Sequence, residues 1–270
     1  MMSAGTVVLV GCGQMGSAML RGWLKSGAAS RFVVVEPAGA PEVLAPSPRV
    51  DAHRTASELS DALAPDAVVF AVKPQVINDI VPAYRRFVRP QTVFMSIAAG
   101  TTIAGLAKHL GDAAIVRVMP NTPAAIGRAI SVACANPGVT GAQRQLCDAL
   151  LAAIGESTWV EDEGLLDAVT AVSGSGPAYV FLLIETLAEA GVKAGLPPDL
   201  ALRLARATVA GSGELARVSH ESPGRLRENV TSPGGTTRAA LDVLMAEDGL
   251  AALMTRAIAA ATARSRALAS

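Results

Sequence analysis

Short apolar runs alternate with amphipathic segments along the first 160 or so residues. The runs rich in Val, Ile and Phe predict strands over residues 6–10, 31–36, 67–72, 92–98 and 114–119. Apolar residues at helical spacing predict helices over residues 14–26, 56–63, 77–87 and 103–110. We also expect strands at 129–133 and 157–160, and the end of a helix at 147–154. This alternation indicates βαβ units, and therefore a mostly parallel, doubly wound α/β sheet.

The pattern changes in the second half of the chain. No strand pattern is found after about residue 165, and helices are expected over residues 178–193, 199–218, 236–245 and 249–267. Another short element begins at residues 224–228. Asp199 follows a Gly-Leu-Pro-Pro break and is expected to cap the second of these helices. The predicted architecture is a dinucleotide-binding-type domain over residues 1–163 and an all-helical domain over residues 164–270.

The first of these helices is apolar on nearly every side. Residues 179–184 read Tyr-Val-Phe-Leu-Leu-Ile, and a helix that is apolar all round must be covered on all sides. The helical domain is too small to do this alone, so we predict a homo-oligomer formed through it. The alternative is that the N-terminal domain covers this helix.

A glycine-rich motif lies between the first strand and the first helix. Gly11, Gly13 and Gly16 form G-x-G-x-x-G, the fingerprint of Rossmann-like dinucleotide binding. The first glycine permits a tight turn, the second lets backbone approach a pyrophosphate, and the third allows close helix–strand packing. The helix N-terminus would then present free N–H groups to the phosphates. The alternative is a glycine turn that binds no ligand.

The end of the second predicted strand bears on the choice of cofactor. Glu36 stands about 20 residues after Gly16, where an acidic side chain can accept a hydrogen bond from the ribose 2′-OH and repel a 2′-phosphate. Pro37 follows it and could turn the side chain away, and Arg54 could offer charge to a 2′-phosphate. On balance Glu36 favours NADH over NADPH.

The third predicted strand ends in Ala71, Val72, Lys73 and Pro74. Ligands of open α/β sheets bind at the carboxyl ends of strands, which makes Lys73 a candidate cofactor contact. It is equally consistent with a solvated loop lysine.

Two further glycine-rich segments precede helices in the second half. One is Ser-Gly-Ser-Gly-Pro at residues 173–177, and the other is Ser-Pro-Gly-Gly-Thr-Thr at residues 232–237. In the first, Ser175 or Gly176 suits the N-cap and Pro177 suits the first turn. Free backbone N–H groups and small hydroxyls at such positions can bind a carboxylate or a phosphate. Each segment alone is also typical of an ordinary capped helix.

The residue types of these segments bear on the reaction. Neither contains His, Lys, Asp or Glu as an evident general acid. Reduction of a ketone usually needs a positioned acid, whereas reduction of a protonated C=N bond needs mainly a hydride and correct alignment. The two segments therefore suit an imine substrate better than a ketone.

Composition excludes several classes of function. Lys and Arg number 23, Asp and Glu number 23, and aromatic residues make up 3%, so a nucleic-acid binder is not expected. Three cysteines without CxxC spacing and three scattered histidines predict no metal site. No targeting segment or transmembrane span is recognised, and we expect a cytoplasmic protein. Cys12 in the glycine turn could be oxidised, although a small buried side chain is the simpler interpretation.

Taken together, these motifs resemble the Δ1-pyrroline-5-carboxylate reductase family over essentially the whole chain. The resemblance is carried by residues 11–16, 71–75, 96–103, 117–123, 171–179 and, most specifically, 226–237. It implies an N-terminal Rossmann domain, a helical domain that interlocks with a second subunit, and assemblies up to decamers. It also implies reduction of 1-pyrroline-5-carboxylate to L-proline with NADPH or NADH, the last step of proline biosynthesis.

The resemblance also assigns roles to residues. The cofactor would be held by residues of the first glycine motif and of two strand ends: Val10, Gly11, Cys12, Gly13, Gln14, Met15, Gly16, Ala71, Val72, Lys73, Pro74, Ile97, Ala98 and Ala99. The substrate would contact the two later motifs: Gly174, Ser175, Gly176, Gly234, Gly235 and Thr236. Thr237 would be the hydroxyl nearest the imine nitrogen, and Ser232 would help to orient the carboxylate. Glu163 lies where the family often has a glutamate near the site.

Two departures from the family pattern concern the cofactor. Many members have Ser, Asn or Arg where this chain has Glu36, and often Asn where it has Arg54. Two rival interpretations also remain. A β-hydroxyacid dehydrogenase would need a lysine acid in its helical domain, where only Lys193 is available, and a non-catalytic NAD(H)-responsive scaffold would reduce no imine. The segment 226–237 argues against both.

Overall fold

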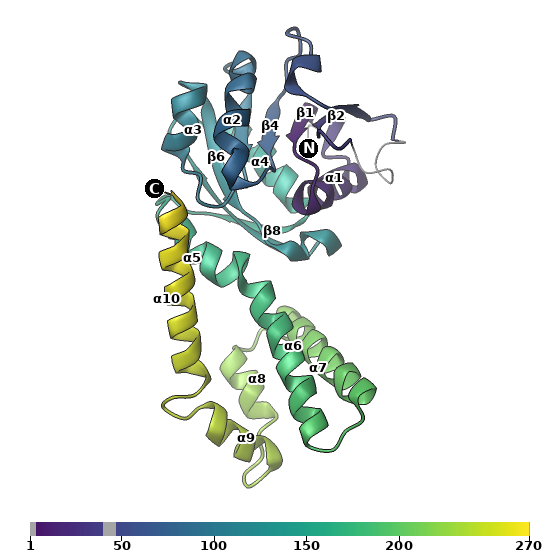
Figure 1. Cartoon of the computed structure of the whole chain (residues 1–270), viewed down its shortest axis with the longest axis vertical. Helices are drawn as coiled ribbons and strands as arrows, with labels where there is room; N and C mark the ends of the chain where they lie inside the picture. The colour runs from purple at the N-terminus through teal and green to yellow at the C-terminus, as the bar shows by residue number, and fades with distance from the viewer. Residues whose placement is uncertain (1–3, 40–46, 270) are drawn as a thin grey trace. The chain divides into compact units, whose positions relative to one another are not determined.

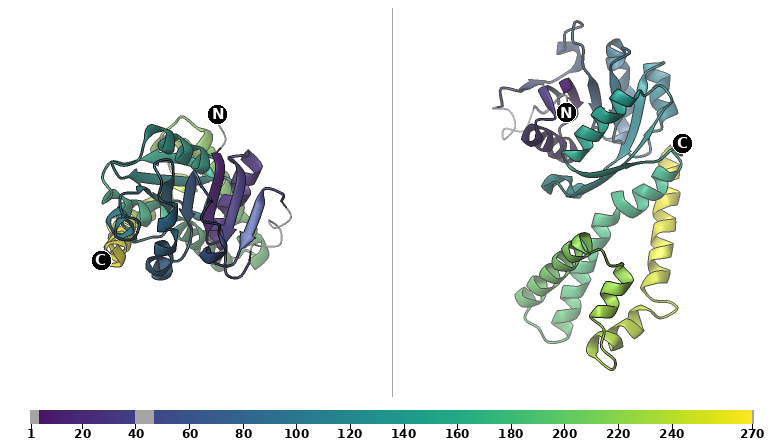
Figure 2. Two further views of the ribbon diagram at one scale, coloured as in Figure 1. Left: turned by 90° about the horizontal axis from the view of Figure 1, so that it is seen from above. Right: turned by 180° about the vertical axis from the view of Figure 1, so that it is seen from behind.

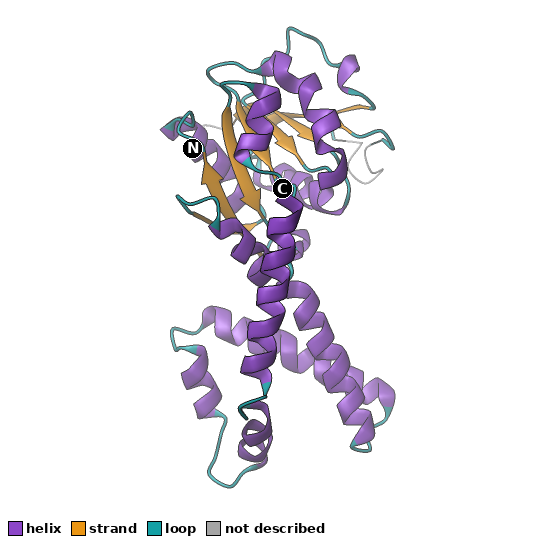
Figure 3. Ribbon diagram, turned by 60° about the vertical axis from the view of Figure 1, so that its left-hand side comes forward, coloured by secondary structure: helices purple, strands orange, loops and turns teal. Residues whose placement is uncertain are grey.

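The computed structural model describes residues 4–39 and 47–269 (Figure 1). The chain divides into two compact units, residues 1–174 with 261–270, and residues 175–260. Every strand belongs to the first unit, and the second is helical (Figure 3). This is the predicted class, an α/β sheet with a helical second part.

The first unit contains an eight-stranded sheet in the order β3-β2-β1-β4-β5-β6-β7-β8. All neighbouring strands are parallel except β6 and β7. The strands span Ala4–Val10, Ala29–Val35, Val50–His53, Ala67–Phe70, Val93–Ser96, Ala114–Met119, Ala129–Ala135 and Gly155–Trp159, in chain order. The chain leaves β1 toward β2 on one side and later returns as β4 on the other, which creates the crevice where such sheets bind ligands.

Apolar side chains pack against both faces of this sheet. Helices lie on each side of it (Figure 2). Along β1, Val7 and Leu9 face one core and Val8 and Val10 face the other, as the period of two in a strand requires. The first core is closed by α1 (Gln14–Ser26) and α4 (Gly141–Ala152). The second is closed by α2 (Ile77–Ile80), η3 (Val81–Phe87) and α3 (Ile103–Leu110).

Some expected elements of the first unit differ from the prediction. The strand β3 was not predicted, because its four residues include the polar Asp51 and His53. The helix expected over 56–63 is only the 3₁₀ turn η1, Ala56–Glu58, and the Arg86 guanidinium donates to the backbone oxygens of Ala56 and Leu59 there.

Proline accounts for two further differences. The helix expected over 77–87 changes to 3₁₀ form at Val81, where Pro82 lacks the N–H that an α-helix needs. The N-cap expected at Asp199 is wrong, because α7 (Pro198–Val218) is capped by Pro197 and Asp199 lies in its first turn.

The other helices follow β8 in the chain, and most of them belong to the second unit. They are α5 (Leu165–Val169), the π-helical η5 (Thr170–Gly174), α6 (Gly176–Lys193), α8 (Pro223–Asn229), α9 (Thr236–Leu244) and α10 (Leu250–Ala269). The helices of residues 175–260 leave many large apolar side chains exposed, among them Phe181 at 59%, Leu182 at 57% and Leu183 at 50%. None of the residues that α6 contributes is buried within the single chain.

Candidate active site

The turn between β1 and α1 has a backbone that tolerates only glycine at two of its three glycine positions. Gly11 has φ +89°, and a Cβ placed there would lie 2.7 Å from the Ala71 carbonyl oxygen. A Cβ on Gly16 would collide with the Gly11 carbonyl oxygen. Gly13, in contrast, has nothing within 4 Å of a Cβ position, and it is the N-cap of α1 with no side-chain hydrogen bond. The bare backbone at Gly13 and the start of α1 fit an approaching pyrophosphate.

The Glu36 carboxylate is bound to this same turn. Its Oε2 accepts a hydrogen bond from the Cys12 backbone N–H at 2.8 Å, and its Oε1 accepts one from the Ala38 N–H at 3.2 Å. Pro37 therefore does not turn the side chain away from the crevice. An acidic side chain fixed beside the turn fits a ribose 2′-OH and opposes a 2′-phosphate.

A pocket of about 500 Å³ opens at the carboxyl ends of β1, β2 and β4. Seven of the predicted cofactor residues line it: Val10, Gly11, Gly13, Glu36, Ala71, Val72 and Lys73. Arg54 also lines it, so the pocket carries the two cations Arg54 and Lys73 and the two carboxylates Glu36 and Asp79. The pocket therefore joins the bare glycine turn to both an acidic and a basic side chain, Glu36 and Arg54.

Several lining residues were not singled out from the sequence. They are Thr55 and Ala56, which follow β3, and Val76, Asp79, Ile80, Ala83 and Tyr84, which belong to η2 (Pro74–Val76), α2 and η3. A helical pattern over 77–87 indicated one buried face, but gave no reason to expect its edge to border a ligand. The predicted cofactor residues Cys12, Gln14, Met15, Gly16, Pro74, Ile97, Ala98 and Ala99 lie outside this pocket lining.

Cys12 lies buried at the turn. Burial raises the pKa of its thiol, and the hydrogen bond with Ser17 acts in the opposite direction. The Ser17 hydroxyl also donates to the Cys12 carbonyl oxygen at 2.6 Å. A thiol held protonated in this way is a poor nucleophile, which supports the structural interpretation of Cys12.

The first of the later motifs is not the open turn that we expected. The helix α5 continues through the π-helical η5, and this segment leads directly into α6. Ser175 is the N-cap of α6, but its hydroxyl makes no capping hydrogen bond. A Cβ on Gly174 would lie 3.3 Å from the Met119 sulfur, and Asn121 donates to the Ser173 hydroxyl at 3.3 Å. The motif therefore borders the end of β6.

The second motif forms the bare turn that the sequence predicts. Gly234 has φ +70°, and Gly235 is the N-cap of α9 without a side-chain hydrogen bond. The Gly235 N–H donates to the Ser232 carbonyl oxygen at 3.1 Å, and a Cβ on Gly235 would meet the Ser232 hydroxyl. Thr237, in the first turn of α9, is half-buried. The turn thus gathers Ser232, Gly234, Gly235, Thr236 and Thr237.

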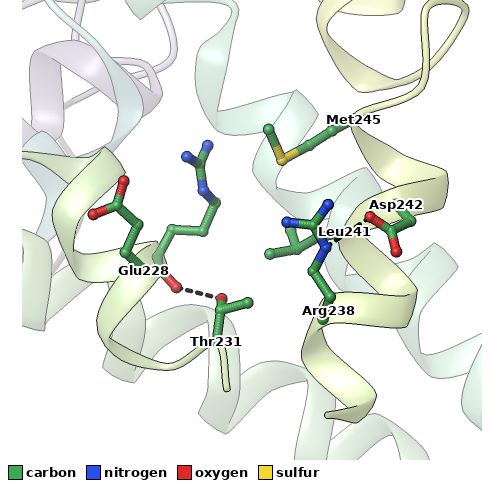
Figure 4. Close-up of a pocket in the computed structure, with 7 residues that line it drawn as sticks. Glu228, Thr231, Arg238, Leu241, Asp242 and Met245 are labelled. Atoms are coloured by element: carbon green, nitrogen blue, oxygen red, sulfur yellow. Dashed lines mark hydrogen bonds and ion pairs between the residues drawn. The ribbon is translucent and has the colours of Figure 1, made fainter. Parts of the chain in front are cut away.

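A second pocket, of about 320 Å³, lies between α8 and α9 (Figure 4). It is lined by Arg227, Glu228, Thr231, Arg238, Leu241, Asp242 and Met245. Arg238 pairs with Asp242 at 2.8 Å, and the Thr231 hydroxyl donates to the Arg227 carbonyl oxygen at 2.6 Å. None of the predicted substrate residues lines this pocket. Among the described residues, no group of three or more His, Cys, Asp and Glu is placed to hold a metal ion.

Comparisons with known proteins identify the relatives of both parts of the chain. Residues 163–268 match the family model for pyrroline-5-carboxylate reductase dimerisation, and residues 6–100 match one for NADP oxidoreductase, coenzyme F420-dependent. The pyrroline-5-carboxylate reductase of Pisum sativum is 38% identical over 97% of this chain and 96% of its own. The chain belongs to the pyrroline-5-carboxylate reductase family.

Further members support this assignment. The pyrroline-5-carboxylate reductase of Pseudomonas aeruginosa is 38% identical over 99% of this chain and 98% of its own. The solved structure of the Coxiella burnetii enzyme has a TM-score of 0.87 at 31% identity, and covers 98% of each chain. The Plasmodium falciparum pyrroline carboxylate reductase, solved with NADP bound, has a TM-score of 0.85 at 29% identity over 100% of each chain. The family resemblance predicted from the motifs is confirmed.

Proposed function

We propose that the protein reduces the cyclic imine 1-pyrroline-5-carboxylate to L-proline with NADH or NADPH, the last step of proline biosynthesis. The observation that carries this proposal is the combination of full-length membership in the reductase family with a 500 Å³ pocket at the glycine turn. When bound, the reduced nicotinamide would supply a hydride to C5 of the protonated imine, and the ring nitrogen keeps the proton of that iminium as the N–H of the amine.

The chain's own residues bind and orient the reactants. The backbone at Gly13 and the start of α1 hold the pyrophosphate, and Lys73 offers a cation in the lining of the same pocket. The bare amides around Gly234, Gly235 and Thr236, together with Ser232, orient the substrate carboxylate, and Gly174, Ser175 and Gly176 border the ring. The Thr237 hydroxyl positions the imine nitrogen. Alignment of this kind is the main catalytic contribution that these uncharged groups can make.

For the cofactor, we propose a preference for NADH. The support is the Glu36 carboxylate, which is fixed 2.8 Å from the Cys12 amide and lines the pocket. A 2′-phosphate would bring negative charge beside it, whereas a 2′-OH can donate to it. Arg54 lines the same pocket and opposes this preference, so the balance of the two side chains decides the selectivity.

We further propose that residues 1–163 bind the dinucleotide and that residues 164–270 bind substrate and form a homodimer, which can assemble further into a decamer. The exposed apolar side chains of α6 support a second copy as the partner. Within the described residues, one helical stretch, Leu165–Lys193, is long and apolar enough to cross a membrane. A single helix of this kind is weak evidence for a membrane protein. The same stretch falls within the dimerisation match, which favours a protein partner for it. We also propose that the enzyme is cytoplasmic and binds neither a membrane nor nucleic acid.

Absorbance at 340 nm tests the reaction directly. Oxidation of NADH and of NADPH is followed with and without pyrroline-5-carboxylate, for the wild type and for Glu36→Ala. Turnover that depends on the imine supports the reaction, and faster turnover with NADH that shifts toward NADPH in the variant supports the preference. Dinucleotide binding without turnover would overturn the reaction and favour a non-catalytic scaffold.

A further inference from the structure

Glu163 lies near the end of the segment that leads from β8 into α5, and its carboxylate accepts two hydrogen bonds. Oε1 accepts from the Ile103 backbone N–H at 2.8 Å and from Arg117 Nη1 at 3.0 Å. Ile103 is the first residue of α3, and Arg117 lies in β6. One carboxylate oxygen therefore joins three segments that are distant in the sequence.

The contact with Glu163 compensates the positive charge of the buried Arg117 side chain. This side chain is 3% exposed, and its Nε and Nη2 have no hydrogen-bond partner among the described residues. Glu163 is thus the acceptor of the one hydrogen bond that the structure gives to this guanidinium. A buried cation with a single anionic partner holds that partner in place, because separating them leaves an uncompensated charge.

The loop that leads into Ile103 lies next to the dinucleotide pocket, although none of its residues lines that pocket. Residues 97–102 connect β5 to α3, and the Ile97 N–H donates to the Phe70 carbonyl oxygen at 3.0 Å. Phe70 ends β4, directly before Ala71, Val72 and Lys73 of the 500 Å³ pocket. The loop therefore lies at the carboxyl ends of the strands, beside the dinucleotide pocket.

The C-terminal end of α10 bounds the same loop from another direction. Gly100 has φ +73°, and a Cβ there would lie 2.9 Å from the Leu268 carbonyl oxygen. The Ser265 hydroxyl of α10 donates to Asp167 of α5 at 2.7 Å. The segments that precede and follow residues 175–260 in the sequence thus hold each other and both contact the loop.

From this arrangement we propose that Glu163 is a positioning residue, which fixes loop 97–102 through the Ile103 amide while Arg117 fixes its carboxylate. Glu163 itself touches no reactant in this role. The inference rests on the proposed function only in that the loop serves a dinucleotide site. Its effect is to hold the loop in one conformation beside the cofactor, so that binding does not have to order it.

Two double variants separate positioning from stability. Arg117→Met with Glu163→Met removes the partly buried ion pair and also the acceptor for the Ile103 N–H. Arg117→Met with Glu163→Gln removes the same charges but keeps an amide oxygen for that N–H. Replacing a buried ion pair with uncharged side chains is often tolerated, so both proteins are expected to fold. Glu161→Gln is the control, since Glu161 is 91% exposed and pairs only loosely with Arg144, at 3.7 Å.

Hydrogen exchange of residues 97–105 and fluorescence titration of NADH and NADPH are the readouts, with melting temperature measured in parallel. The Met/Met variant is expected to exchange faster in this loop and to bind dinucleotide about tenfold more weakly, whereas Met/Gln and Glu161→Gln remain close to the wild type. Equal loop exchange and equal affinity in Met/Met and Met/Gln would overturn the proposal. Neither readout needs the imine, so failure of the proposed reaction would show separately as absence of turnover by the wild type.

Discussion

The Glu36 carboxylate accepts a hydrogen bond from the Cys12 backbone amide at 2.8 Å, so a side chain from the end of β2 is fixed against the glycine turn that follows β1. In this position it borders the dinucleotide pocket that Arg54 also lines. If the dinucleotide binds here as proposed, the charge of Glu36, and not only its hydrogen bond, would act on the ribose.

Glu36→Gln separates these two contributions. The amide oxygen can still accept from Cys12, but the negative charge is lost, so the penalty on a 2′-phosphate falls. We expect the ratio of kcat/KM for NADPH to that for NADH to rise about tenfold, which corresponds to about 1.4 kcal/mol. Asp61→Asn, at an exposed carboxylate paired with Arg86, makes the same change in net charge and should leave the ratio unchanged.

Alanine is expected to have different effects at Gly16 and at Gly13 of the glycine turn. A methyl group at Gly16 would collide with the Gly11 carbonyl oxygen, so Gly16→Ala is expected to lower the melting temperature. A methyl group at Gly13 meets nothing within 4 Å, so Gly13→Ala should keep the melting temperature and weaken dinucleotide binding. Thermal denaturation and fluorescence titration test both, and a Gly13→Ala protein with wild-type affinity would remove Gly13 from the site.

The Thr237 hydroxyl is the group that we assign to the imine nitrogen. Loss of one positioned donor in an active site typically lowers kcat by about 10²-fold, and we expect this order of effect from Thr237→Ala. Thr255→Ala is the matched control, because that hydroxyl donates to the Ala251 carbonyl oxygen within its own helix. Steady-state kinetics with wild-type kcat and KM for Thr237→Ala would refute the assignment.

Because α6 exposes an apolar face, a charged side chain introduced on that face is expected to dissociate the proposed dimer. Phe181 is 59% exposed in the single chain, and burial of an aspartate at this position in a dimer would be strongly unfavourable. Phe181→Asp is therefore expected to sediment as a monomer at micromolar concentration. Ile126→Asp, at a 77% exposed side chain of the first unit, should keep the wild-type sedimentation coefficient. A Phe181→Asp protein that remains oligomeric would place the interface elsewhere.

Helices and strands whose form is set by neighbouring residues could be predicted from the sequence. The helix over 14–26 and the strand over 114–119 have the predicted bounds, since each has an uninterrupted period and clear end signals. The 3₁₀ turn at residues 56–58 was not predictable, because the Arg86 side chain that donates to its carbonyl groups comes from a distant segment. The pattern therefore identified most elements, but not those shaped by tertiary hydrogen bonds.

The candidate site divides in the same way. The glycine turn and the residues after β4 could be predicted from motifs, because backbone requirements are local there. The contacts of Glu36 with Cys12 and of Glu163 with Arg117 join residues that the sequence separates widely, so only the folded chain brings them together. The π-helical entry to α6 was also missed, since no composition signal distinguishes it from a turn.

The buried thiol of Cys147 is expected to make the free energy of unfolding depend on pH in the alkaline range. Burial raises the pKa of its thiol to about 12 from an ordinary value of 9.0, and the charge of Asp148 adds to this shift. Above pH 9 the unfolded chain loses this proton while the folded chain keeps it, so the free energy of unfolding falls as pH rises from 9 toward 12. The slope from this group alone approaches about 1.4 kcal/mol per pH unit.

Cys147→Ala removes the group and therefore its slope. The variant is expected to be less stable than the wild type at pH 8.5, because a fully buried side chain is truncated, but the difference should narrow by about 1–2 kcal/mol by pH 10.5. Urea denaturation at both pH values measures this, at one fixed protein concentration because association contributes to stability. Subtracting the variant from the wild type cancels the titration of all other groups, so a difference that stays constant with pH would show that the thiol ionises equally in both states.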